Sequence, residues 1–230
     1  MPARKPREEM PKEVREQVDL LENALPLVRQ RAAEALGEIK HKSAVPHLIQ
    51  ALKDPVWQVR GHAAEALGKI GHVSAVPNLA KALQGEKEHF EVRWRAATAL
   101  GKIGHESAVP HLVKALQDEY SPVREEAVEA LGRIGHESAV PSLVKALKDP
   151  YLSARLKAVW ALGVTGRSIQ GKKVKSKEAK ALQLVGAYFR EKETPKTILK
   201  SFHAALEGKV TKENARLYVK QLRALEGSVK

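Results

Sequence analysis

LGKIGHESAVPHLVKALQD, at residues 100–118, decides the fold, because close versions of it recur three more times. The other copies are LGEIKHKSAVPHLIQALKD at 36–54, LGKIGHVSAVPNLAKALQG at 67–85 and LGRIGHESAVPSLVKALKD at 131–149. The glycines that mark successive units are spaced by 31, 33, 31 and 31 residues: Gly37, Gly68, Gly101, Gly132 and Gly163. A fixed period of this length indicates a chain built by stacking one structural unit.

Each unit carries the signals of two helices. A short helix is expected over about 75–84 in the second unit, and a longer one over about 56–70. The predicted N-caps of the short helices are Ser43, Ser74, Ser107 and Ser138. The predicted left-handed ends of the long helices are Gly71, Gly104 and Gly135. Glycine inside a helix costs roughly 1 kcal/mol relative to alanine, so the recurrence of Gly68 and its equivalents predicts a close helix contact.

The consensus DxxVRxxAAxALGxIGxxSAVPxLxxAL resembles the short HEAT repeat, often called the phycobilisome-lyase HEAT-like repeat. The resemblance covers residues 11–166, with residues 13–25 as a divergent first helix. It implies an all-α fold, an α-solenoid of about five HEAT helical hairpins with a basic helical C-terminal segment. It also implies a structural arginine in each Val-Arg pair, bonded to the aspartate six residues earlier, as in Asp54 and Arg60. Gly85 replaces that aspartate before Arg93.

The composition excludes several classes of protein. The 230 residues contain no cysteine, which excludes disulfides, thiol catalysis and thiolate metal sites. No run of 18 apolar residues exists, and the charged residues 1–10 are expected to be disordered rather than to form a signal peptide. We therefore expect a cytoplasmic protein without membrane contact. Two methionines among many Lys, Glu and Arg residues are compatible with a thermophilic source.

The net charge of +13 is concentrated near the C-terminus. Residues 167–230 contain 16 basic and 6 acidic residues. We expect a basic linker at 167–176, followed by three helices at 177–230 that form either a cap on the solenoid or a separate domain. The basic candidates are Lys172, Lys173, Lys175, Lys177 and Lys180. They form either a solvated linker or a contact for a polyanion.

The sequence predicts no catalytic residue, no metal ligand and no cofactor. One histidine recurs in each repeat: His41, His72, His105 and His136. Stacked repeats are roughly 10 Å apart, so these side chains cannot converge on one ion, and a structural role after a helix end is favoured. Deoxyhypusine hydroxylase, a HEAT enzyme, holds iron with His-Glu pairs in the second helix, whereas His105-Glu106 lies in a loop. No residue supports bilin lyase activity.

In HEAT proteins the second helix of each hairpin lines the concave face, which the resemblance carries onto the long helices here. The candidate groove residues are Trp57, His62, Lys69, Phe90, Trp94, Arg95, Lys102, Arg133, Lys157 and Trp160. Tryptophan and arginine are enriched at binding hot spots, although packing between helices would also explain some of the tryptophans. The predicted function is a non-enzymatic scaffold for a protein partner. The alternative is a nucleic-acid-associated protein that uses residues 167–230.

Overall fold

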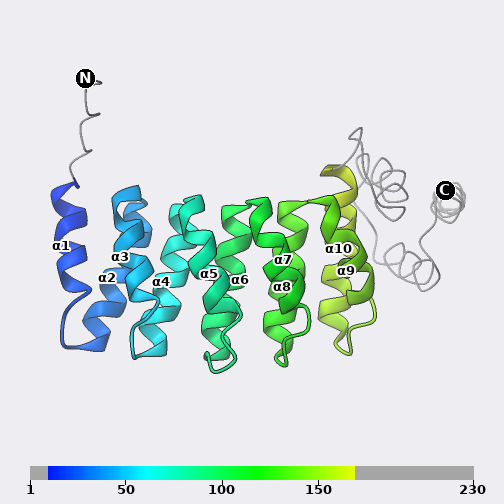
Figure 1. Ribbon diagram of the computed structural model, residues 1–230, viewed down its shortest axis with the longest axis horizontal. Helices are drawn as coiled ribbons and strands as arrows, with labels where there is room; N and C mark the ends of the chain where they lie inside the picture. Colours follow the sequence, from blue (N-terminus) through cyan, green and yellow to red (C-terminus); the bar gives the residue numbers. More distant parts are fainter. Residues whose placement is uncertain (1–9, 169–230) are drawn as a thin grey trace, which may run out of the picture.

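The computed structural model describes residues 10–168, which form five antiparallel helical hairpins stacked in one direction (Figure 1). Each hairpin pairs a first helix with a second, longer one. The first helices are α1 (Lys12–Leu20), α3 (Val45–Ala51), α5 (Val76–Leu83), α7 (Val109–Ala115) and α9 (Val140–Ala146). The long helices are α2 (Pro26–Ile39), α4 (Trp57–Ile70), α6 (Phe90–Ile103), α8 (Ser121–Ile134) and α10 (Leu152–Ser168). The predicted α-solenoid is confirmed.

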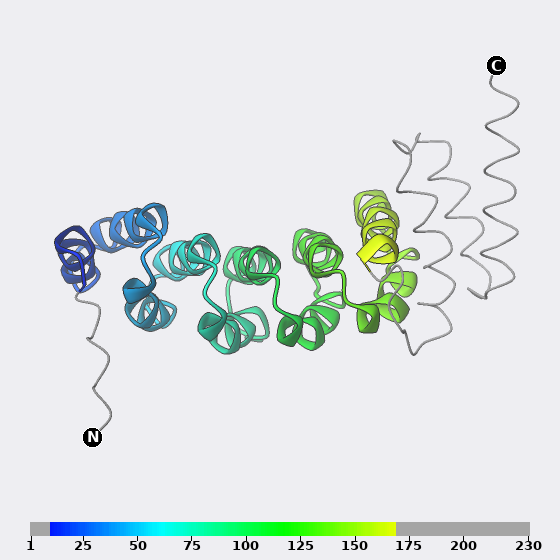
Figure 2. The same cartoon turned by 90° about the horizontal axis from the view of Figure 1, so that it is seen from above.

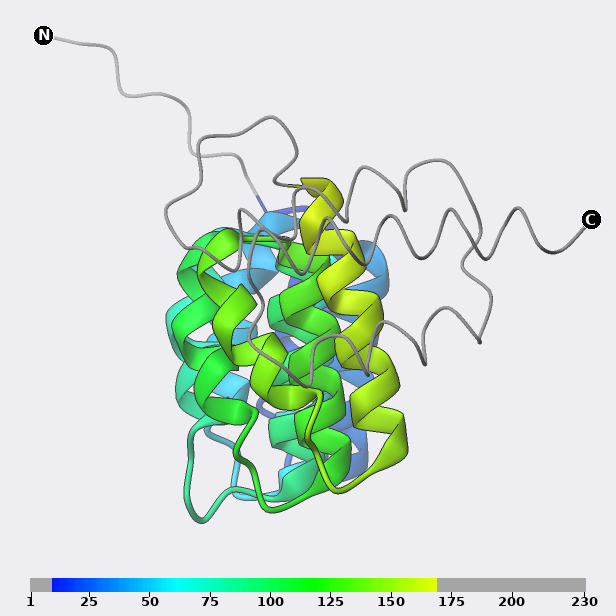
Figure 3. The same ribbon diagram turned by 90° about the vertical axis from the view of Figure 1, so that its right-hand side faces the viewer.

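The helices form two layers. The long helices make one row and α3, α5, α7 and α9 make the other, as the view from above shows (Figure 2). The long-helix row is bowed, so that α2 and α10 rise above the middle of the row and its exposed side is the inside of the curve (Figure 2). Seen along the stack, the short helices lie on one side and the long helices on the other (Figure 3).

The core lies between these layers and repeats with the sequence. The largest fully buried side chains are one leucine from each helix that faces this core: Leu36, Leu48, Leu67, Leu79, Leu100, Leu112, Leu131, Leu143 and Leu162. Buried alanines and valines fill the space between them. No single hairpin could cover its own leucines, so each repeat depends on its neighbours for burial.

The glycines inside the long helices bring neighbouring helices together. A Cβ placed on Gly101 would lie 2.8 Å from the Cβ of Ala130 on the next helix, and one on Gly68 would lie 2.7 Å from the Cα of Ala99. These separations are too short for carbon atoms, so only glycine fits. The predicted close contact is confirmed, and it explains why the long helices form the tighter row.

The helix ends agree with the prediction in part. Gly71, Gly104 and Gly135 have φ angles of 75°, 70° and 63°, so the left-handed ends are confirmed. In the first repeat Lys40, with φ 56°, takes this position. The opening helix ends at Leu20 and a turn precedes Pro26, so the prediction of one helix over 13–25 was wrong about its end.

The prediction that serines cap the short helices was also wrong. A 3-10 turn precedes each short helix, at Lys42–Ala44, Val73–Ala75, Glu106–Ala108 and Glu137–Ala139. Its N-cap is the repeated histidine, not the serine. In His105, for example, the Nδ1 atom accepts a hydrogen bond of 3.3 Å from the backbone N–H of Ser107, and the Ser107 hydroxyl lies 2.8 Å from the same nitrogen. The histidine series is therefore structural, as expected, but through a capping role at the start of the next element.

Candidate binding face of the long helices

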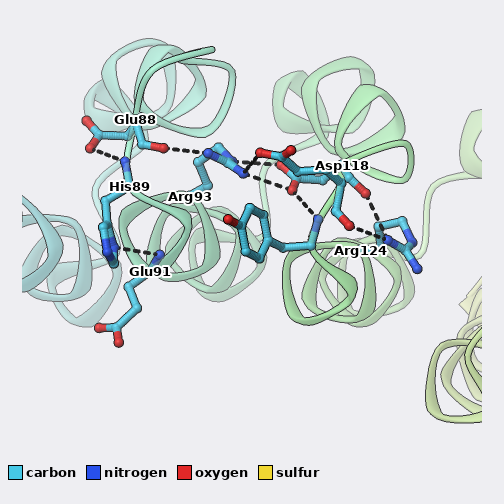
Figure 4. Close-up of polar contacts among 8 residues, drawn as sticks. Glu88, His89, Glu91, Arg93, Asp118 and Arg124 are labelled. Carbon is cyan, nitrogen blue, oxygen red and sulfur yellow. Dashed lines mark hydrogen bonds and ion pairs between the residues drawn. The ribbon is translucent and has the colours of Figure 1, made fainter.

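The long-helix face is the exposed side of α2, α4, α6, α8 and α10. Its spacing is fixed by arginines at the fourth position of the long helices, which contact the loops that precede these helices. Arg93 donates from Nε and Nη2 to the carboxylate of Asp118 at 2.8 and 3.0 Å, and from Nη1 to the carbonyl of Glu88 at 2.5 Å (Figure 4). The same bidentate contact joins Arg29 to Asp54 and Arg124 to Asp149. Each arginine thus joins its own loop to that of the next repeat.

These contacts form an arginine ladder along the stack, in which the arginine of one long helix binds a carboxylate in the loop of the next repeat. The partner predicted for each arginine, the aspartate six residues earlier, was therefore wrong. Arg60 does reach Asp54, but it donates to the backbone carbonyl at 2.6 Å, and the Asp54 carboxylate is bound by Arg29 of the preceding repeat. Gly85 removes the carboxylate that Arg60 would meet in the following loop. Glu88, in the two-residue insertion, replaces it and accepts from Arg60 Nη2 at 2.6 Å. The insertion therefore supplies the carboxylate that Gly85 lacks. The ladder is continuous from Arg29 to Asp149.

The buried carboxylates of the ladder have altered acidity. Burial acts to raise the pKa of Asp149, but the hydrogen bonds from Arg124 and from the backbone N–H of Tyr151 outweigh it, so that pKa lies below its ordinary value. Asp54 shows the same balance with Arg29, and its pKa is also lowered. The charged forms are therefore stabilised by folding.

Two of the candidate groove residues lie in a row of aromatic side chains at the rim of the face, where the long helices begin. Trp57 stacks on His89 with ring centroids 4.0 Å apart, and His89 packs against Phe90 at 4.9 Å. Phe90 in turn stacks on Tyr120 at 4.9 Å. Trp57 and Phe90 are the first residues of α4 and α6, so this row follows the start of the long helices. These two side chains pack between repeats, the alternative that the sequence left open for part of the aromatic set.

Four charged side chains form a network over the first half of the face. Lys69 on α4 lies 2.8 Å from Glu38 on α2 and 3.0 Å from Glu65 on its own helix, and Arg95 on α6 pairs with Glu65. The hydrogen bond to Glu38 raises the pKa of Lys69, against the effect of burial, and lowers the pKa of Glu38. The candidates Lys69 and Arg95 thus hold neighbouring helices together. Each of them already forms an ion pair with a glutamate of this protein.

His62 lies in the same half of the face. Its Nε2 is 3.1 Å from the side-chain amide of Gln30 on α2. Burial lowers the pKa of His62 below its usual 6.5, and the nearby charge of Arg95 adds to this effect. The imidazole is therefore neutral at neutral pH and is held by the preceding repeat.

A second network covers the other end of the face. Glu129 on α8 lies 3.0 Å from Lys157 on α10 and accepts a 2.5 Å hydrogen bond from Arg133 on its own helix. Glu126, one turn earlier, is 7% exposed, and its Oε1 atom has no hydrogen-bond partner within the described residues. Arg133 Nη1 lies 3.8 Å from that oxygen.

The remaining candidates are the exposed ones and lie between and beside these networks. Trp94 on α6 is 37% exposed and Trp160 on α10 is 44% exposed. Trp94 borders a depression of about 290 Å³ that is also lined by Glu65, Arg95, Thr98, Ala99 and Lys102. Lys102 is exposed and has no ion-pair partner among residues 10–168. The α6 part of the face thus exposes the apolar area of Trp94 and the ammonium group of Lys102, which is unpaired in the described part of the chain.

Eight of the ten candidates lie along the exposed face of the long helices, and the other two, Trp57 and Phe90, lie in the aromatic row at the start of these helices. The basic candidates from Lys172 to Lys180, the linker and the C-terminal helices lie outside the described residues. Sequence reasoning missed His89, Tyr120 and Glu88, which complete the rim and the ladder. The helical spacing places Glu126 on this face, but its burial was not predicted, because a glutamate at a helix surface position carries no signal of burial. Within residues 10–168, no group of three or more acidic or histidine side chains could hold a metal ion.

The chain belongs to the family of HEAT repeats, whose pattern matches residues 15–89, 86–163 and 110–196. Among solved structures, it is similar to a chain from the complex of CpcE and CpcF of phycocyanin lyase from Nostoc sp. PCC7120. That match has 22% identity and a TM-score of 0.60, and covers 98% of this chain and 99% of that one. The family match confirms the predicted HEAT repeats.

A designed armadillo repeat protein in complex with the peptide (KR)4 is also similar, with 21% identity and a TM-score of 0.58 over 90% of this chain and 98% of that one. At these identities the likeness establishes the α-solenoid fold alone. No curated protein matches the chain. Among the described residues, no helix has both the length and the apolar character needed to span a membrane.

Proposed function

We propose that the chain is a non-enzymatic scaffold that binds a protein partner along the long-helix face. The observation that carries this proposal is the exposure of Trp94 and Trp160 on a face where Lys69, Arg95 and Lys157 are engaged by carboxylates of neighbouring helices. Tryptophan combines a large apolar area with few rotatable bonds, and it dominates the energetics of many interfaces. The indole rings have no structural task that requires this exposure.

The rigidity of the face supports the proposal. The arginine ladder and the Gly–Ala contacts fix the distance between long helices, so the two tryptophans are presented in a preformed arrangement. A preformed surface loses little conformational entropy on binding. The solenoids similar to this one include a peptide complex and a protein–protein complex, which is consistent with such a role.

The test is affinity capture from the source cells, with Trp94→Ala and Trp160→Ala compared with Val73→Ala. Val73 is a control because it is 45% exposed in the 3-10 turn before α5, away from the long helices. We expect the tryptophan variants to lose a protein that the wild type and Val73→Ala retain, with unchanged circular dichroism. Equal capture by all four proteins would refute the proposal.

The second candidate function is nucleic-acid contact through residues 167–230. It is favoured by their 16 basic and 6 acidic residues. Fluorescence anisotropy with duplex DNA and structured RNA over a salt series tests it, because backbone contacts release counterions and weaken steeply with salt. Binding that is insensitive to Trp94→Ala but steeply dependent on salt would favour this function over the scaffold.

A further inference from the structure

The charge pattern of the long-helix face is broken at α8. The sixth residue of α6 is Arg95, which pairs with Glu65 on α4, and the sixth residue of α10 is Lys157, which pairs with Glu129 on α8. In both cases a cation reaches back to a carboxylate at the ninth position of the preceding long helix. This arrangement repeats across two of the helix junctions.

At the junction between α6 and α8 both partners are changed. The sixth residue of α8 is the acidic Glu126, and the ninth residue of α6 is Thr98, which carries no charge. The Thr98 hydroxyl donates to the backbone carbonyl of Trp94 at 3.1 Å. The junction therefore has a carboxylate where α6 and α10 have a cation, and the ninth position of α6 carries no charge.

The consequence is an unsatisfied acidic group. Glu126 is 7% exposed, and its Oε1 atom is buried without a hydrogen bond. Arg133 approaches to 3.8 Å but gives its hydrogen bond to Glu129. Buried carboxylates in folded proteins are nearly always hydrogen-bonded, because removal of the charge from water is costly otherwise. A group of this kind on a binding face indicates that its partner comes from another molecule.

We propose that Glu126 anchors an arginine or lysine side chain of the bound protein segment, an inference that rests on the proposed scaffold function. Two observations identify the occupant as cationic. Glu126 Oε1 has no hydrogen-bond partner among the described residues, and the exposed indoles of Trp94 and Trp160 lie on the helices to either side, with Arg95 5.9 Å from the centroid of the Trp94 ring. Indole faces attract guanidinium and ammonium groups.

Glu126 Oε1 is buried, so a ligand reaches this carboxylate when a neighbouring side chain such as Arg133 moves aside. Arg133 is 37% exposed and retains Glu129 as its partner if it moves aside. Trp160 lies over Gly132, whose added Cβ would be 2.9 Å from the indole ring, so the ring borders α8 from the other side. An extended peptide that crosses α6, α8 and α10 would therefore meet one indole, the carboxylates and then the second indole.

The test uses the full chain and fluorescein-labelled peptides of equal length built from Arg-Ala, Ser-Ala or Glu-Ala repeats. We expect the Arg-Ala peptide to bind best to the wild type, and Glu126→Gln to weaken that binding about tenfold, or ~1.4 kcal/mol. Glu13→Gln, in the first turn of α1, is the control and should bind as the wild type does. Binding of the Arg-Ala peptide no tighter than the Ser-Ala peptide would overturn the inference.

Thermal unfolding tests whether Glu126 serves to bind the partner or to stabilise the solenoid. Glu126→Gln removes a charge that has no hydrogen bond, so the melting temperature should stay the same or rise. Glu129→Gln removes a paired charge and should lower it. A lower melting temperature for Glu126→Gln would show that Glu126 stabilises the solenoid and would overturn the inference. If Trp94→Ala loses a partner that Glu126→Gln retains, the inference fails and the scaffold function stands.

Discussion

Asp118 and Glu119 both contact the guanidinium of Arg93, but we expect their removal to lower the free energy of unfolding by very different amounts. Asp118 accepts two hydrogen bonds from Arg93 and a third, of 2.9 Å, from the backbone N–H of Tyr120, and both charged side chains are at most 10% exposed. Asp118→Ala leaves the Arg93 charge without this partner. Because loss of one member of a buried pair costs about 3–5 kcal/mol, we expect a loss of about 3 kcal/mol in the free energy of unfolding.

Glu119→Ala is the matched control. Glu119 also contacts Arg93, at 3.4 Å, but its side chain is 75% exposed, so its loss should cost less than about 0.5 kcal/mol. The assay is urea unfolding followed by far-ultraviolet circular dichroism, with the midpoint and the slope fitted for both variants. Equal losses for the two variants, or a loss below about 1 kcal/mol for Asp118→Ala, would refute the view that the ladder fixes the repeats.

Three further predictions concern the stability of the solenoid. Gly101→Ala should lower the free energy of unfolding by about 1–2 kcal/mol in urea, because overlap with Ala130 outweighs the better helix propensity of alanine. His105→Ala removes an N-cap and should cost about 1 kcal/mol in the same assay, with helix content retained. Since the pKa of Asp149 is lowered by Arg124, its contribution is present above the unfolded value of 3.8 and is lost as the pH falls through the folded value. In a urea series at decreasing pH, the stabilities of the wild type and Asp149→Asn should therefore begin to approach each other below about pH 4 and converge below the lowered pKa of Asp149.

Each of these has an outcome that contradicts it. A more stable Gly101→Ala would mean that the helices can separate without cost. Full stability in His105→Ala would assign the cap to the serine after all. A difference between wild type and Asp149→Asn that persists at low pH would show that shape, rather than charge, gives that aspartate its effect.

The repeat made most of the fold predictable. A period of 31–33 residues, with glycine and proline at fixed places, determines where helices begin and end before any contact is known. The errors concern partners across repeats. Arg60 lies six residues after Asp54, so the local pair was the natural expectation, but stacking places Glu88 of the next loop beside its guanidinium. Spacing along the chain cannot show which loop lies alongside.

The candidate face was predictable only in outline. Its helices followed from the resemblance, and Trp94 and Trp160 are exposed there as a binding face requires. Trp57 and Phe90 differ because the first residue of a long helix lies at the rim, where rings from adjacent loops stack. The burial of Glu126 depends on the side chains around it, and helical periodicity alone does not contain that information.

The central claim is that a protein partner covers the long-helix face, and the absence of cysteine allows a direct test. Lys102→Cys places a thiol on α6 at that face, and Lys114→Cys places one on α7 in the other layer; both lysines are exposed. The measurement is the rate of maleimide labelling with and without the captured partner. We expect the partner to slow labelling at position 102 and to leave the rate at position 114 unchanged. Protection at 114 alone, or at neither position, would contradict it.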